Sequence, residues 1–145
     1  MSDDKHEGGC LCGAVRYRIQ GAARWVAHCH CQSCRRHTGS PVTTFVGLTK
    51  PQVEFIAGTP RERESSANVW RRHCADCGTP LTYEAKHCDD ETHVYLCTLD
   101  DPGAFTPGLH VYTEEAVAWL HLDDGLPRYA KTAREGGPVQ VPEAG

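Results

Sequence analysis

The sequence predicts an all-β fold with at most two short helices. Three observations predict it. Short runs of β-branched and aromatic residues recur along the chain, 14 glycines and 9 prolines separate them, and they show neither an internal repeat nor an alternation of strands with helices. The length of 145 residues matches one domain with a modest core. We expect this domain to span residues 1–130, with a polar C-terminal tail over residues 131–145.

About eight short strands are expected, and the first is the most regular. In it, Val15, Tyr17 and Ile19 alternate with two arginines, which is the period of a strand with one buried face. Residues 1–8 are polar and are expected to form a loose start. The mixed-charge run 61–66 is expected to be a solvated strand or loop. The other strands are apolar or β-branched runs bounded by turn residues, at 25–28, 42–48, 53–56, 69–73, 81–84, 94–99 and 109–112.

Two short helices complete the predicted elements. Residues 31–37 can form one helical turn that ends before Gly39. Thr113 can cap a second short helix that continues to Trp119. A small all-β fold also needs large apolar side chains in its core, and we expect the three tryptophans to lie there: Trp25, Trp70 and Trp119.

Nine cysteines indicate metal binding rather than disulfides. The polar residues 1–7 are not followed by an apolar run, so the sequence shows no signal peptide, and its apolar stretches are too short to cross a membrane. We therefore expect a cytoplasmic, reducing location, where clustered cysteines are more often metal ligands. An odd number of cysteines also excludes complete disulfide pairing within one chain.

The formal net charge of −4 gives the chain no general attraction to phosphate backbones. Nucleic acid is therefore not an expected partner, and neither is a membrane. A small molecule is the expected partner, and a homo-oligomer is compatible with the sequence.

Seven of the cysteines fall into three groups: Cys10 and Cys12; Cys29, Cys31 and Cys34; and Cys74 and Cys77. A structural zinc is closed by four tetrahedral ligands, and the first and last pairs together supply four sulfurs. The middle group then supplies three ligands and keeps a fourth position for water or substrate. Zinc sites with such an open position are typically catalytic.

Spacing alone leaves two alternatives open. In one, the last pair closes a site with two cysteines of the middle group, and Cys10 and Cys12 bind nothing. In the other, the same thiols hold an iron–sulfur cluster, although the familiar ferredoxin spacings are missing.

Three motifs carry a resemblance to a known family: GCLCGAV at residues 9–15, CHCQSCRR at residues 29–36 and CADCGTPL at residues 74–81. In this order they resemble the Gfa family, the glutathione-dependent formaldehyde-activating enzymes, also called the CENP-V/GFA domain. The resemblance covers nearly all of residues 8–130.

The resemblance implies an Mss4-like fold of small β-sheets around a metal, with two zinc ions per chain. It implies a structural zinc on the first and last pairs, Cys10, Cys12, Cys74 and Cys77. It implies a catalytic zinc on the middle group, Cys29, Cys31 and Cys34. The implied activity is that of a carbon–sulfur lyase similar to S-hydroxymethylglutathione synthase. Such an enzyme acts on adducts of an aldehyde such as formaldehyde with glutathione, as co-substrate, or with another small thiol.

Four residues near the middle group are further candidates. Arg35 and Arg36 could bind the carboxylates of a glutathione-like ligand, because a guanidinium matches a carboxylate in shape, but an ordinary surface role is equally compatible. His30 and His37 could transfer a proton, although a position at the surface or behind the ligands is the expected one for each.

Two other functions remain open on the sequence. A non-catalytic zinc module for protein interaction would have a fourth protein ligand on the middle group. A thiol redox protein would need a reactive free cysteine, either Cys88 or Cys97. We expect Cys88 to be a surface thiol in a polar loop and Cys97 to be a core residue and a spare ligand.

Overall fold

The computed structural model describes residues 4–139, and it divides the chain into two compact units. Unit 1 comprises Met1–Trp25 and Phe45–Thr106, and unit 2 comprises Val26–Thr44 and Pro107–Gly145. Strands dominate the described residues, which contain one α-helix. The predicted all-β class with little helix is therefore confirmed. In the described part of the chain, no helix has both the length and the apolar character needed to cross a bilayer.

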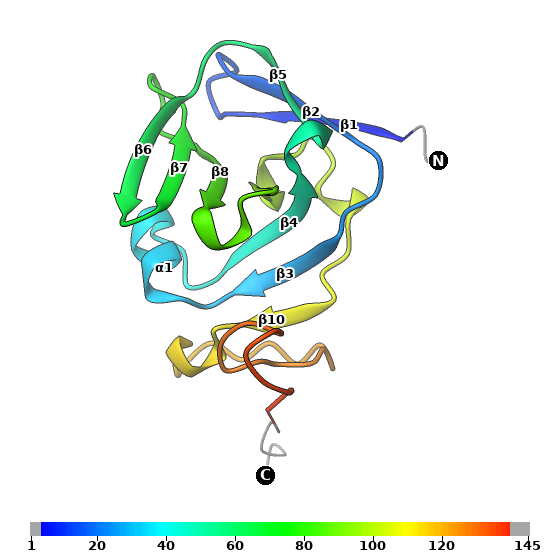
Figure 1. Ribbon diagram of the computed structural model, residues 1–145, viewed down its shortest axis with the longest axis vertical. Coiled ribbons are helices and arrows are strands. Elements are labelled where there is room, and N and C mark those ends of the chain that lie inside the picture. The colour runs from blue at the N-terminus through cyan, green and yellow to red at the C-terminus, as the bar shows by residue number, and fades with distance from the viewer. Residues whose placement is uncertain (1–3, 140–145) are drawn as a thin grey trace. The chain divides into compact units, whose positions relative to one another are not determined.

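Unit 1 contains a three-stranded antiparallel sheet in the order β1 (Lys5–Gly9), β2 (Arg16–Gln20) and β5 (Val53–Ala57) (Figure 1). The alternation predicted for β2 is present, because Tyr17 and Ile19 are buried while Arg18 reaches Glu7 at 3.3 Å.

The expected loose start at residues 1–8 is wrong from Lys5 onward. These residues form β1, which pairs with β2 along its whole length. Backbone pairing needs no apolar side chains, so composition gives no sign of it. A glycine is required at position 8, because a Cβ there would lie 2.4 Å from the Tyr17 hydroxyl.

The remaining strands of unit 1 are antiparallel neighbours and include the fully buried Val46, Leu48, Leu81 and Val94. The β6 strand (Arg61–Ser66) is exposed along its whole length, as its mixed charges predict. Figure 1 shows it side by side with β7 (Val69–His73) and β8 (Pro80–Ala85). In sheet order these strands are β4 (Thr43–Thr49, in this unit from Phe45), β9 (Glu91–Tyr95), β8 (Pro80–Ala85), β7 (Val69–His73) and β6 (Arg61–Ser66).

The strand predicted at residues 94–99 ends early, because residues after Tyr95 turn into a 3-10 helix. This turn leaves Cys97 exposed, whereas Cys88 is buried with 7% of its surface accessible. Cys88 was expected at the surface and Cys97 in the core, so both expectations are wrong. The 3-10 helices of unit 1 are η1 (Lys50–Gln52), η2 (Lys86–Cys88), η3 (Leu96–Thr98) and η4 (Pro102–Ala104).

Unit 2 pairs β3 (Trp25–Cys29, in this unit from Val26) in parallel with β10 (Leu109–Val111), so that Val111 lies opposite Cys29. Helix α1 (Gln32–Thr38) follows β3 directly (Figure 1). The segment beyond Gly125 also joins β10, because the His110 N–H donates to the Pro127 carbonyl at 2.9 Å.

The second predicted helix is a single 3-10 turn, η5 (Thr113–Glu115). Its first flanking residue, Tyr112, is left-handed, and the backbone is extended again at Ala116, so no helical bonds propagate further. Trp119 is 69% exposed, which corrects its expected place in the core.

Candidate metal centres

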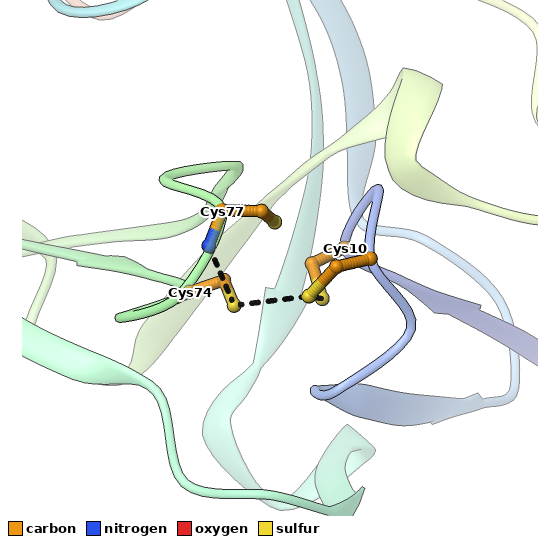
Figure 2. A group of neighbouring side chains, drawn as sticks. Cys10, Cys74 and Cys77 are labelled. Carbon is orange, nitrogen blue, oxygen red and sulfur yellow. Dashed lines mark hydrogen bonds between the residues drawn. The ribbon is translucent and has the colours of Figure 1, made fainter.

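The first candidate centre is the four-cysteine group, formed in unit 1 by two turns. Cys10 and Cys12 lie in the turn between β1 and β2, and Cys74 and Cys77 lie in the turn between β7 and β8. Figure 2 shows the side chains of these two turns gathered together. The four sulfurs lie within 4.8 Å of one another.

The sulfur spacing of the four-cysteine group fits tetrahedral zinc. Zn–S bonds of about 2.3 Å at tetrahedral angles place the sulfurs about 3.8 Å apart. The Sγ atom of Cys12 is 3.6 Å from that of Cys10 and 3.7 Å from that of Cys74. This group brings together the four residues that the resemblance implies for a structural site.

Hydrogen bonds to sulfur prepare the four-cysteine group for a cation. The Val15 N–H donates to Cys10 Sγ at 3.2 Å. The Thr79 hydroxyl oxygen accepts the Leu11 N–H at 3.0 Å, which leaves its own proton for Cys77 Sγ at 3.2 Å. Hydrogen bonds to Cys77 from the side chain and from the backbone of Thr79 are the main reason that the pKa of Cys77 falls to about 5. The thiolate form that a metal requires is therefore favoured.

The second candidate centre is the three-cysteine group of unit 2, which comprises Cys29, Cys31 and Cys34. Cys29 ends β3, Cys31 caps the N-terminus of α1, and Cys34 lies within the helix. The sulfurs of Cys29 and Cys34 are 3.9 Å apart, and all three lie within 4.8 Å of one another. Cys31 is the most accessible member, and its Sγ accepts the Cys34 N–H at 3.3 Å.

Two features of the three-cysteine group favour an open metal site. Adjacent Cys31 and Cys34 raise the pKa of Cys29, so the three thiols need a cation to ionise together. Among residues 4–139, no His, Asp or Glu ligand atom joins the group. Three ligands and a free tetrahedral position are the arrangement of catalytic zinc sites.

A hydrogen-bonded chain of two buried histidines and an exposed carboxylate begins at His30, inside the segment that carries the three-cysteine group. His30 lies between two of the cysteines in sequence, with 1% of its surface accessible, and its Nε2 is 2.8 Å from His110 Nδ1. His110 Nε2 in turn lies 2.7 Å from the carboxylate of Asp124. The sequence predicted no role for His110 or Asp124, because both lie far from His30 in the chain and no local pattern marks them.

The hydrogen bonds fix the proton positions in this chain. The Asp124 carboxylate accepts the His110 Nε2 proton, so His110 Nδ1 accepts the proton on His30 Nε2. Burial and the neighbouring His110 lower the pKa of His30 to about 4, which keeps its ring neutral near pH 7. Its Nδ1 atom therefore carries a lone pair, and this buried atom has no hydrogen-bond partner.

The two candidate arginines differ in what they contact. The Nη2 atom of Arg35 donates to the Glu115 carbonyl at 3.1 Å, and the Glu115 side chain accepts the Gln32 N–H at 3.0 Å. Arg35 thus joins α1 to η5. Arg36 is exposed on the helix, as is His37.

Tyr112 is a third residue that sequence patterns did not reveal. Its φ of 55° is unusual for a bulky residue, and it directly follows the residue paired with Cys29. Burial raises the pKa of Tyr112, and the charges of Glu135, Cys29 and Cys31 add to this rise. Such a backbone is often found beside functional groups.

Comparisons with known proteins agree with this architecture. The family model described as glutathione-dependent formaldehyde-activating enzyme matches residues 5–115. An uncharacterised lyase of Schizosaccharomyces pombe is 32% identical over 79 residues, which cover 54% of this chain and 57% of that protein. The match thus spans little more than half of this relative.

The fold has a counterpart among solved structures. A crystal structure of a Rhodobacter sphaeroides protein aligns with a TM-score of 0.56 at 16% sequence identity. The alignment covers 85% of this chain and 98% of the other. At this identity the likeness shows the fold.

Proposed function

The chain belongs to the family of glutathione-dependent formaldehyde-activating enzymes, and from this premise we propose that it is a zinc-dependent carbon–sulfur lyase. Its proposed substrates are adducts of an aldehyde such as formaldehyde with glutathione or another small thiol. The lyase relative in Schizosaccharomyces pombe supports the reaction class.

The observation that carries this proposal is the contrast between the two cysteine groups. The four-cysteine group offers a complete tetrahedron and suits a structural zinc. The three-cysteine group offers three sulfurs and no fourth side-chain ligand among residues 4–139, which argues against a closed, non-catalytic site there. When bound, zinc would favour the thiolate form of a substrate sulfur at its open position.

The residues around the three-cysteine group supply the proton chemistry. Cleavage of an S-hydroxymethyl adduct removes the hydroxyl proton, forms the aldehyde C=O bond and breaks the C–S bond, whose electron pair stays on sulfur. His30 Nδ1 is the proposed acceptor of that proton in the substrate complex, where the substrate hydroxyl would become the hydrogen-bond partner that this buried atom lacks, and the thiolate later takes the proton back. His110 and Asp124 hold the His30 ring in the required tautomer.

Arg36 is the better candidate for a carboxylate of the thiol substrate. It is exposed on the helix that carries Cys34, whereas one arm of Arg35 is bonded to Glu115. A guanidinium binds a carboxylate through two parallel hydrogen bonds.

The test uses magnetisation-transfer NMR to measure the rate at which free glutathione and formaldehyde exchange with their adduct in the presence of zinc-loaded protein. We expect the wild-type chain to accelerate exchange and Cys31→Ser to lose on the order of 100-fold of that acceleration. Cys97→Ser changes an exposed thiol outside both groups and serves as the matched control. The proposal is contradicted if Cys31→Ser keeps full activity. It is also contradicted if the zinc-loaded wild type accelerates exchange with no small thiol and aldehyde.

A further inference from the structure

We propose that Cys88, Glu91 and His93 form a third metal site in unit 1, suited to a divalent ion such as Zn²⁺. The site is separate from both cysteine groups, and the inference does not depend on the proposed lyase activity. The three residues lie on η2 and at the start of β9, within six positions of one another in the chain.

The three ligand atoms are spaced like the corners of a zinc tetrahedron. Cys88 Sγ is 3.9 Å from His93 Nε2, and His93 Nε2 is 3.1 Å from Glu91 Oε1. All three atoms lie within 4.8 Å of one another. Zinc with ordinary bond lengths requires about 3.6 Å between sulfur and nitrogen and about 3.3 Å between nitrogen and oxygen. Each observed distance needs to change by only about 0.3 Å.

The geometry differs from that of a catalytic cysteine triad. In a triad, the histidine meets the nucleophile through one ring nitrogen and the carboxylate through the other. Here the thiol and the carboxylate both face the same atom, His93 Nε2. Convergence of three donors on one point is what a cation needs.

The surrounding residues hold two of the ligands in place. The second carboxylate oxygen of Glu91 accepts from Arg24 Nη1 at 3.2 Å and from Trp25 Nε1 at 3.3 Å. The first oxygen therefore stays directed at His93. The His93 ring stacks on Tyr83 at 5.2 Å and meets the edge of Trp25 at 4.5 Å. Such outer contacts orient metal ligands in known sites.

The charges at this site also fit a divalent ion. Cys88 and Glu91 are 7% and 3% accessible, and both are anionic when they bind a metal. Arg24 contacts Glu91, but it is also paired with Asp90 at 2.8 Å. A divalent ion balances the two ligand charges. A thiolate with an imidazole selects zinc over hard ions such as Mg²⁺ or Ca²⁺.

The inference can be tested on the whole protein reconstituted with ¹¹³Cd²⁺, because the ¹¹³Cd chemical shift reports the number of bound thiolates. We expect three resonances, one each for four, three and one thiolate. The one-thiolate resonance should disappear in Cys88→Ser and His93→Gln, and zinc content should fall from three ions to two. Cys97→Ser is the matched control and should keep all three resonances.

The result is independent of catalysis. If the wild-type spectrum shows only the two multi-thiolate resonances, or if the third resonance persists in both variants, the site does not exist. If a variant fails to fold, the wild-type spectrum still decides. A lack of lyase activity together with three resonances would reject the proposed function and retain this site.

Discussion

At the scale of single residues, the buried ring of His110 has both nitrogens in hydrogen bonds, one with His30 and one with Asp124. It belongs to neither cysteine group and is proposed to act by holding the His30 ring in one tautomer. A positioning residue of this kind affects the rate without affecting metal content.

We therefore predict that His110→Asn lowers kcat on the order of 10- to 100-fold while zinc content stays unchanged. The pH profile of kcat should also change, because the proton on His30 Nε2 is no longer fixed. His37→Gln, at an exposed position on α1, is the control and should retain the wild-type profile. Loss of zinc in His110→Asn would instead indicate a role in the fold.

Tyr17 predicts how stability depends on alkaline pH. Thr98 Oγ1 donates to the Tyr95 carbonyl, so the Tyr17 hydroxyl must donate to Thr98, at 2.6 Å. Burial raises the pKa of Tyr17 above its usual value of 10.0, although Thr98 offsets part of this. Of the charges that act on the hydroxyl, Asp100 raises this pKa further and Arg16 lowers it.

The folded state keeps the Tyr17 proton at a pH where the unfolded chain has lost it. The contribution of Tyr17 to stability is therefore complete below about pH 10 and is lost as pH rises beyond it. Urea denaturation of wild type and Tyr17→Phe from pH 8 to 11 measures this. The variant should lose stability less steeply above pH 10, and parallel curves would contradict the prediction.

At the scale of elements, Gly47 in β4 lies opposite His93 in β9, and the Trp25 ring covers it. A Cβ on Gly47 would lie 2.1 Å from that ring, so Trp25 must move. We predict that Gly47→Ala destabilises the fold by about 1 to 3 kcal/mol, the usual cost of overpacking.

Urea denaturation followed by tryptophan fluorescence measures this loss. Gly137→Ala is the matched control, because a Cβ there meets nothing within 4 Å and should leave the midpoint unchanged. A Gly47→Ala variant as stable as the wild type would show that the Trp25 ring is not fixed over the strand.

Structural features that depend on residues close together in the chain could be predicted from the sequence. The alternation in β2, the exposed charged strand β6 and the cysteine turns all depend on neighbouring residues, and the structure contains each of them. The β1 strand was missed because its pairing uses the backbone alone. The helix predicted at Thr113 was wrong because Tyr112 adopts a left-handed backbone that side-chain patterns do not encode.

Long-range residues of the candidate sites were beyond sequence reasoning for the same reason. His110, Asp124 and Glu115 approach α1 and β3 only through tertiary pairing. Cys88 was expected at the surface because polar residues surround it, yet the polar Glu91 and His93 are the residues whose ligand atoms face it.

At the scale of the whole molecule, each unit carries its own cysteine group. The four-cysteine group connects the β1–β2 turn to the β7–β8 turn, so its metal should stabilise unit 1 by about several kcal/mol. The three-cysteine group has one ligand fewer and should release its metal more readily.

We predict stepwise metal loss under increasing chelator concentration. Metal should leave first from the two sites with three ligands, which are the three-cysteine group and the site at Cys88, Glu91 and His93. Its loss should end the proposed lyase activity, while the far-UV circular dichroism spectrum stays unchanged. Metal on the four-cysteine group should leave last, together with unfolding. Cys74→Ser should remove the last step and lower Tm, whereas Cys97→Ser should change neither. Unfolding at the first step would contradict this assignment.

The discontinuous course of the chain through the two units also has a consequence for biosynthesis. Unit 1 is complete once the ribosome has added Thr106, whereas the second half of unit 2 starts only at Pro107. Because folding can begin during translation, the four-cysteine group can close on the nascent chain. Because β10 and His110 follow unit 1 in the chain, they leave the ribosome after it, whereas the cysteines at 29, 31 and 34 leave earlier. The three-cysteine group therefore reaches its final surroundings last, and a growing chain can complete the four-cysteine group before it completes the proposed active site.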